Sequence, residues 1–594
     1  MRYIPRSFAL RTLIATAVGV LLAASSFGST SDAPSRQPAD LVVLNGKVFT
    51  ADSRSSVQQA FAVTDQKFVA VGSNSEIHQY VGPKTRVLDL KGEFVSPGLT
   101  DDHFHNEGGG PGIDLSHVRA LPELLTVVAN AAQAAPKGAL LISNSDWHEA
   151  QLKEQRLPTA AELTQAAPDN PVVLVRGGHS IILNRKALER WHITTETPVP
   201  AGGGISRDAG GQLTGEIFDN AKSLVQLPPE QPVTMQDLLT TQKTVNAYGI
   251  TSVRIPGAYK GDLLTAYRLM KEAEASGSLS LRYTVYLPGF TLRSAAQVDE
   301  LLRKWNVKLD EGDEWVRIGG IKLIVDGGFE GGHLSRPYDE PWGKGGTYSG
   351  VTVTPPAAYN EVVAEINRLG WRATTHAVGD AALDQVLAGY EAADRKHSLN
   401  GRRWAVEHVF VAHPEQLARL KKLDVDVSAQ DHLYLAAPAL RKYWGWSRAS
   451  EVTPVKDFLR AGLVVAGGTD SPVVPFNPFF ALYHFMSRDT ISDGIYGADQ
   501  GIASRPLVLE LFTSHFAQLI GESATRGSIE PGKFADFAIL NADFLTAPAH
   551  AIRDMKALAT FVGGREVYRN PTFAADGKPL AGASLRQAGI GSGS

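Results

Sequence analysis

The chain contains no cysteine among its 594 residues. This absence excludes disulfide bonds, thiolate metal sites and a cysteine nucleophile. Net charge is also small, −4, because 58 basic residues nearly balance 62 acidic ones, so the chain has no basic field for nucleic acid. It lacks a long apolar run beyond its N-terminus, which excludes a polytopic membrane protein. With 43% hydrophobic residues, it can instead bury the large core of a globular protein.

The first thirty residues are typical of a secretory signal peptide. Arg2, Arg6 and Arg11 precede an uncharged run at 13–24, and small residues follow it. The run is too short to span a bilayer, so we expect residues 1–29 to be removed. The mature protein would then be periplasmic or secreted, with no stable membrane span. An uncleaved membrane anchor is the alternative interpretation.

Short β-type runs near both ends of the chain predict one split domain. They lie at 41–49, 60–63 and 68–72, and again at 532–540 and 559–567. The first group indicates a small antiparallel sheet. Because the ends of a chain often lie close together, we expect residues 40–92 and 525–575 to form a composite β-sandwich.

Eight β-rich runs between these ends predict an α/β fold, a (β/α)8 TIM barrel over residues 93–510. The runs lie at 93–99, 251–255, 282–287, 319–325, 371–375, 403–406, 425–429 and 463–468. Helix-like stretches separate most of them, which favours parallel strands that close into a barrel. Two further β-like runs, at 140–143 and 172–176, lie in the long interval between the first and second barrel strands. We therefore assign residues 115–235 to an insertion after the first barrel strand. An open doubly wound sheet is the alternative, but no glycine-rich dinucleotide loop follows a strand.

Polar residues stand at or near the ends of these runs. The first run leads into Asp102-His103-Phe104-His105, where strand alternation places the two histidines on one side. Because barrel active sites lie at the carboxyl ends of the strands, residues far apart in the chain would meet there. The candidates for a metal site are His103, His105, Lys322, His376, His408 and Asp470.

Taken one at a time, these residues have ordinary structural interpretations. His376 and His408 could be hydrogen-bonded core histidines, Asp470 could cap a turn, and Lys322 could reach solvent. Their common place at the ends of, or within, the predicted strands favours a shared site instead. Histidines elsewhere are expected to be structural or exposed; they are His78, His397, His515 and His550.

Several ordered segments carry a family resemblance. They are FVSPGLTDDHFH at 94–105, IKLIVDG at 321–327, HAVGD at 376–380, EH at 407–408, TDSP at 469–472 and GSIEPGKFAD at 527–536. The first resembles the opening motif of the amidohydrolase superfamily. Together they are similar to amidohydrolase family 3, the YtcJ-like branch that includes N-substituted formamide deformylase. The resemblance extends from about residue 40 to about residue 570.

The resemblance implies a metal-dependent hydrolase that cleaves a C–N, amide-type bond of a small molecule with metal-activated water. Zinc is the usual metal, as one or two ions. By motif position, His103 and His105 would bind one ion and His376 and His408 a second, while Asp470 would bind metal and transfer protons as the catalytic residue. Lys322 stands where relatives can carry a carbamate that bridges two ions, whereas the cysteine-bridged variant is excluded. Homodimers are common among such barrels.

The same motifs contain candidates for orienting the metal ligands, and other segments contain candidates for binding the substrate. Asp102, Glu407 and Asp380 are candidates for holding the metal ligands, because each is next to or near one in the sequence. The segments at 328–336 and 176–179 depart from the usual pattern of the branch, and both are expected to face the substrate. The candidates for substrate binding are Trp147, His148, His179, His333, Arg336 and His432.

Two other functions remain compatible with this sequence. The same metal centre could hydrolyse a lactone, an ester or a phosphoester, since one barrel family carries out many reactions. A non-catalytic periplasmic binding or regulatory protein is the other alternative. Retention of every expected ligand type, Asp470 included, favours an enzyme.

Overall fold

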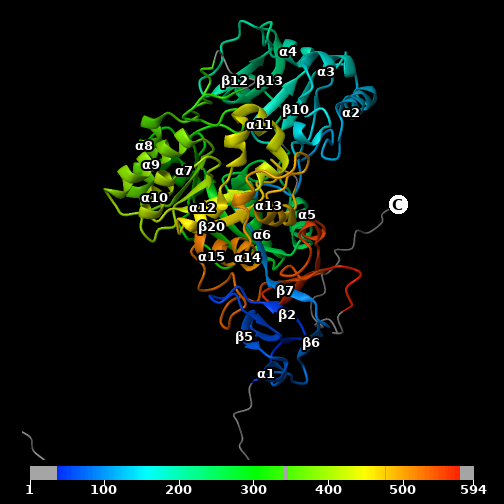
Figure 1. Ribbon diagram of the computed structural model, residues 1–594, viewed down its shortest axis with the longest axis vertical. Helices are drawn as coiled ribbons and strands as arrows, with labels where there is room; N and C mark the ends of the chain where they lie inside the picture. Colours follow the sequence, from blue (N-terminus) through cyan, green and yellow to red (C-terminus); the bar gives the residue numbers. More distant parts are fainter. Residues whose placement is uncertain (1–36, 230, 340–345, 475, 575–594) are drawn as a thin grey trace, which may run out of the picture. The chain divides into compact units, whose positions relative to one another are not determined.

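The computed structural model describes residues 37–574, except 230, 340–345 and 475 (Figure 1). The predicted signal peptide, residues 1–29, lies outside the described residues. Within the described part, no helix is both long enough and apolar enough to cross a membrane.

Eight parallel strands form a nearly closed barrel, as predicted. They are β8 (Leu99–Asp101), β14 (Ile250–Pro256), β15 (Arg282–Pro288), β16 (Val316–Ile324), β17 (Ala373–Ala377), β18 (Ala405–His408), β19 (Asp426–Gln430) and β20 (Val465–Gly468). The last strand returns to the first: the Asp102 amide donates to the Gly467 carbonyl at 3.1 Å, and the Asp470 amide donates to the His103 carbonyl at 2.7 Å. This closure brings residues at the two ends of the barrel sequence into contact.

Helices accompany the barrel strands. They are α5 (Met235–Asn246), α6 (Leu263–Ala275), α7 (Ala295–Trp305), α8 (Pro356–Arg368), α9 (Asp380–Asp394), α10 (Pro414–Leu423), α11 (His432–Ser450), α12 (Val455–Arg460), α13 (Pro478–Ser487), α14 (Arg505–Leu511) and α15 (Ser514–Leu519). Most of them share the barrel's apolar core, whereas α11 packs mainly in a separate apolar cluster with Phe329 and Phe410. In α9 the buried residues Leu383, Val386, Leu387 and Tyr390 follow a helical spacing, so one face of the helix packs inward. These residues belong to the same apolar core as the barrel strands.

Strands from both ends of the chain form two further sheets. One contains β5 (Lys67–Gly72), β4 (Ala60–Thr64), β1 (Leu41–Leu44) and β6 (Arg86–Asp89); the other contains β23 (Arg565–Arg569), β22 (Ala557–Val562), β21 (Phe537–Leu540), β7 (Phe94–Pro97), β2 (Lys47–Phe49) and β3 (Val57–Gln58). Phe61 of one sheet packs edge-on against Phe537 of the other, with ring centroids 4.9 Å apart. The two sheets therefore share an apolar core.

The expected small antiparallel sheet is mixed instead. β1 pairs antiparallel with β4 but parallel with β6. A parallel pair needs a crossover connection, and α1 (Asn74–His78) lies in the segment that leads to β6.

The run at 93–99 was predicted as one barrel strand, and this was wrong. Its first part, β7, pairs with β21 in the six-stranded sheet, and only β8 joins the barrel. Gly98 lies at the change of sheet, where a Cβ atom would stand 2.1 Å from Thr251 Oγ1. Only glycine permits so close an approach to β14. Apolar character by itself does not tell which sheet a strand joins.

The insertion after β8 contains its own sheet of five strands. They are β12 (Gly203–Arg207), β13 (Leu213–Asp219), β11 (Ser180–Leu183), β10 (Val172–Arg176) and β9 (Leu141–Ile142), accompanied by α2 (Leu121–Ala134), α3 (Ala160–Ala166), α4 (Arg185–Arg190) and the short 3-10 helix η1 (Glu149–Gln151). Only β9 and β10 were predicted. β10 pairs antiparallel with β11, and the turn between them carries His179.

Candidate metal centre

The segment after β8 presents two histidines to the inside of the barrel mouth. His103 and His105 alternate with Phe104, which is fully buried. Its ring contacts those of Tyr259 and Phe476 on the opposite side. The apolar contact of Phe104 thus fixes the direction of both imidazoles.

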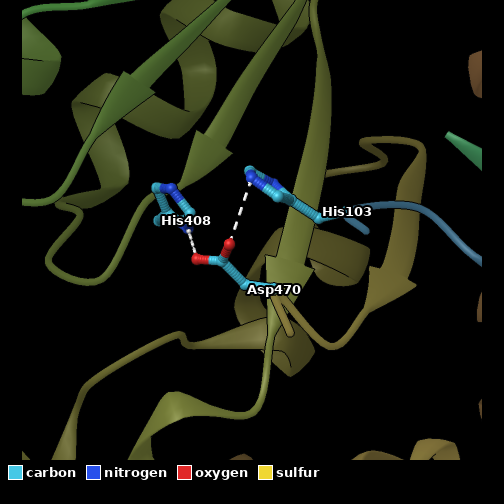
Figure 2. Close-up of side chains that lie close together, drawn as sticks. All are labelled: His103, His408 and Asp470. Atoms are coloured by element: carbon cyan, nitrogen blue, oxygen red, sulfur yellow. Dashed lines mark ion pairs between the residues drawn. The ribbon is translucent and has the colours of Figure 1, made fainter. Parts of the chain in front are cut away.

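His103, His408 and Asp470 meet at the carboxyl ends of the strands. One ligand atom from each lies within 4.8 Å of the others, and all three residues are buried. Figure 2 shows the Asp470 carboxylate facing both rings, with one oxygen toward each. Asp470 Oδ1 lies 3.4 Å from His103 Nε2, and Oδ2 lies 4.0 Å from His408 Nδ1.

The backbone is unusual at two of these positions. His408 has φ +72° and Asp470 has φ +57°, in the left-handed region that residues with a side chain seldom adopt. Such strain persists where the surrounding structure enforces it, and it concentrates at functional sites.

The hydrogen bonds of the histidines leave lone pairs directed at the cluster. His103 Nδ1 donates to Glu407 Oε2 at 2.8 Å, and His105 Nδ1 donates to the Ala258 carbonyl at 2.9 Å. These partners only accept, so in the tautomer with its hydrogen on Nδ1 each ring keeps a lone pair on Nε2. His105 Nε2 nevertheless lies 3.1 Å from Asp470 Oδ1, another acceptor. Acceptors facing one another at this distance fit a bound cation between them.

The ionisation of these residues also suits a cation. Burial, followed by the charge of Lys322, lowers the pKa of His103 to about 3. Burial and the neighbouring His376 hold the pKa of His408 well below its usual range. Burial opposes ionisation of Asp470, but contacts that include the one with His432 outweigh burial and keep its pKa well below the usual range. The site therefore offers neutral imidazoles and a carboxylate, which are metal ligands.

A buried ionic network supports His103 from behind. Arg254 of β14 binds Asp102 through Nε at 2.8 Å and Glu407 through Nη2 at 2.7 Å, and all three side chains are fully buried. Glu407 in turn accepts the hydrogen bond from His103. This arrangement orients a histidine through a carboxylate, as is common behind metal ligands.

Of the three residues predicted to orient the metal ligands, only Glu407 contacts one of these ligands. Glu407 contacts His103, whereas Asp102 binds Arg254. Asp380 accepts from the Ser335 amide at 2.8 Å and from His413 at 3.0 Å, so it lies with other partners. Its prediction from proximity in the sequence was wrong.

Two of the predicted ligands lie beside the three-residue cluster. His376 is buried with its ring centroid 4.5 Å from that of His408, but its Nε2 lies 3.1 Å from the Gly327 carbonyl. Lys322 is also buried; its Nζ lies 4.0 Å from Glu407 Oε1 and has no hydrogen-bond partner among the described residues. Burial lowers the pKa of Lys322 to about 8.

A cavity adjoins the cluster, and some of the substrate-binding candidates line it. His148, His179 and His432 do so, together with His376, His408 and Asp470. His179 donates through Nδ1 to Asp219 Oδ1 at 2.7 Å, and His432 Nε2 contacts Asp470 Oδ2 at 2.9 Å.

The other candidates lie elsewhere. Trp147 is fully buried in the core of the insertion, where its indole N–H donates to the Val175 carbonyl at 2.6 Å. Arg336 is exposed, and His333 is half-buried outside the cavity lining. The cavity residues Arg176, Phe329 and Glu330 lie in the two segments expected to face the substrate, although none was named as a binding residue, and Phe410 was not predicted. For Arg176, its place at the end of the apolar run at 172–175 was an available signal.

The comparison with protein families agrees with this geometry. Residues 86–568 match the model described as "Amidohydrolase family". The chain belongs to the amidohydrolase family. The match includes every strand of the barrel and all the residues of the cluster.

Individual relatives match most of the chain. N-substituted formamide deformylase of Arthrobacter pascens is 26% identical over 549 residues, covering 89% of this chain and 98% of that protein. Protein LONG AFTER FAR-RED 3 of Arabidopsis thaliana is 28% identical over 557 residues, covering 89% and 92%. The crystal structure of an uncharacterized metal-dependent hydrolase from Pyrococcus horikoshii superposes with a TM-score of 0.63 at 24% identity, covering 86% of this chain and 99% of that one. The last similarity establishes the fold.

Proposed function

We propose that this protein is a metal-dependent amidohydrolase that cleaves a C–N bond of a small molecule. The observation that carries the proposal is the convergence of His103, His105 and Asp470, whose facing acceptors fit a cation at the barrel mouth. Similarity to a formamide deformylase over nearly its whole length favours an amide-type bond. The N-terminal sequence extends the proposal to action in the periplasm or outside the cell.

Zinc is the metal that we propose for this site. His103, His105, His408 and Asp470 would hold it, with His376 and Lys322 beside them for a second ion, because imidazole and carboxylate ligands suit zinc. A bound zinc ion would lower the pKa of a water molecule and polarise the scissile carbonyl.

Asp470 is the residue that we propose to transfer protons. Its Oδ2 is held by His432 at 2.9 Å, and its Oδ1 faces the histidine pair. The carboxylate faces the histidine pair at the barrel mouth, where its free lone pairs can accept a proton from water. It would then deliver this proton to the leaving nitrogen.

Metal analysis tests the first part of the proposal. We expect one or two transition-metal ions per chain after expression with zinc, and a lower content in His103→Ala, which removes a ligand. The exposed His397 offers a matched control, and His397→Ala should keep the wild-type content. A folded wild-type protein that contains no metal under these conditions would refute the metal site.

A substrate panel tests the reaction class. The metal-loaded protein would be assayed with formamides, N-acyl amino acids, lactones, esters and phosphoesters. Turnover of the amide-type compounds supports the proposal. Turnover confined to lactones, esters or phosphoesters would replace it with the other hydrolase function, and no turnover at all would favour a binding or regulatory protein.

Lys322 provides a separate prediction, carbamylation of its side chain. Its Nζ is buried and has no hydrogen-bond partner among the described residues, and the pKa of about 8 leaves a reactive neutral fraction that can take up carbon dioxide. We expect native mass spectrometry to detect the added carbon dioxide. Lys322→Ala should lose activity, and short carboxylic acids should restore part of it. Unchanged metal content and rate in Lys322→Ala would instead make Lys322 a packing residue.

A further inference from the structure

We propose that the end of the cavity formed by His148 and Glu330 binds a neutral group of the substrate that both donates and accepts a hydrogen bond. Such a group is a carboxamide or a hydroxyl. The kinetic test of this inference rests on the proposed function, because it measures hydrolysis of an amide-type bond. The inference deepens that function by assigning the chemistry of the substrate beyond the scissile bond.

Arg176, at the end of β10, organises this part of the cavity. Its guanidinium binds Glu330, which follows β16 of the barrel, and its Nε lies 3.0 Å from Glu149 Oε2 in the insertion. The Tyr443 hydroxyl of α11 donates to Glu149 Oε1 at 3.0 Å. All four side chains are buried. These contacts connect the insertion to the barrel and hold the polar end of the cavity in place.

His148 presents an unused donor there. Its Nδ1 accepts the amide N–H of Ala150 at 3.1 Å, so the hydrogen of the neutral ring is on Nε2. Burial and the charge of Arg176 hold the pKa of His148 well below its usual range, which keeps the ring neutral. His148 is only 2% exposed and lines the cavity, yet its Nε2 has no partner among the described residues.

Glu330 presents an unused acceptor in the same cavity lining. Arg176 binds its Oε1, while Oε2 is buried and has no hydrogen-bond partner in the described part of the chain. Leaving a buried donor and a buried acceptor unpaired is costly, so the two atoms point to a ligand that pairs with both. A carboxylate would be repelled by Glu330, and an ammonium group would offer nothing to His148.

Aromatic rings line the path between this end and the metal cluster. Phe329 and Phe410 stack with centroids 5.6 Å apart. The Phe329 ring lies 5.8 Å from that of His148, and the Phe410 ring lies 5.7 Å from that of His408. A flat apolar body therefore suits the middle of the substrate. The scissile amide would lie at one end of it and the neutral polar group at the other.

A matched substrate series tests the proposal. Formanilides that differ only at the para position would carry hydrogen, carboxamide, hydroxymethyl, carboxylate or aminomethyl. We expect kcat/KM for the carboxamide or the hydroxymethyl compound to exceed that of the unsubstituted one by about tenfold or more, because the buried polar atoms become paired. The carboxylate and aminomethyl compounds should have a lower kcat/KM than the carboxamide and hydroxymethyl compounds and than the unsubstituted one. Equal kcat/KM for the unsubstituted, carboxamide and hydroxymethyl compounds would overturn the inference.

Two variants separate substrate recognition from a structural role. In His148→Asn the amide oxygen can still accept the Ala150 N–H, but no donor reaches the cavity; Glu330→Gln replaces the acceptor. Each variant should reduce the preference for the favoured polar compound over the unsubstituted one by about tenfold. The control His397→Asn should leave this preference unchanged. A variant pair that lowers kcat/KM for every compound alike would assign His148 and Glu330 to structure only and contradict the proposal.

Equilibrium binding distinguishes failure of this inference from failure of the proposed function. Calorimetry with benzamide and benzyl alcohol needs no turnover. If no formanilide is hydrolysed but either compound binds, and His148→Asn weakens its binding about tenfold, the subsite stands without the proposed reaction. If the folded, metal-loaded protein binds neither compound, the subsite is overturned.

Discussion

Asp470→Asn is expected to lower kcat by at least about two orders of magnitude while the protein keeps its fold and most of its metal. Asparagine has the size of aspartate and retains one oxygen as a ligand, but it cannot accept the proton of water. General acid–base catalysis of this kind contributes roughly 10²–10⁴ in rate. The position of Asp470, 3.1 Å from His105 Nε2 and 2.9 Å from His432 Nε2, places the carboxylate where this transfer would occur.

Three measurements together check this expectation. Thermal unfolding and metal content should remain close to wild type, and steady-state kinetics should show the loss in kcat. The half-exposed Asp457 on α12 supplies a control, since Asp457→Asn should leave kcat unchanged. If Asp470→Asn turns over substrate within a few-fold of wild type, Asp470 is a structural residue and the mechanism proposed above is incorrect.

The largest effect on stability is expected for Arg254→Ala. This change removes the only cation that contacts both Asp102 and Glu407 in the described network, and both carboxylates are fully buried. Breaking a buried ion pair from one side costs about 3–5 kcal/mol of the free energy of unfolding, because the remaining charges lose their partner in a poorly solvated place. Metal binding should weaken as well, since Glu407 orients His103.

Denaturant unfolding of the metal-free protein measures this cost directly. Arg460→Ala is the matched control, because Arg460 is largely exposed and pairs with Asp457 on the surface, where an ion pair contributes about 0–1 kcal/mol. A loss below about 1 kcal/mol in Arg254→Ala would mean that water or a rearranged side chain compensates the two carboxylates.

Much of the barrel was predictable from local pattern. Seven of the eight predicted runs share two or more residues with a barrel strand, because apolar strand sequences alternate with helical ones along the chain, whereas the run at 93–99 shares only Leu99. The exception is informative. Residues 93–99 lead from one sheet into another at Gly98, and this change depends on the close approach of Thr251, which is far away in the sequence. The three strands of the insertion that were missed, β11, β12 and β13, depend in the same way on pairing with distant partners.

The candidate site was only partly predictable. His103, His408 and Asp470 could be named because polar residues at strand ends stand out from apolar runs. Arg254 is also a charged residue inside an apolar strand, a signal that was present but not used. Asp380 was misplaced because closeness in the sequence was taken for closeness in space, although α9 directs its side chain toward His413.

Residue types and their order along the chain were sufficient to indicate the barrel, the family resemblance and the amino acids able to bind a metal. Strand alternation and apolar runs are local properties, so they can be read without knowing which segments meet. Closure of the barrel, the facing acceptors around Asp470, and the unpaired atoms of His148 and Glu330 were decided only by the tertiary structure. Each of these features depends on distances between residues from different strands or from the insertion, and such distances follow from packing of the whole chain rather than from any one segment.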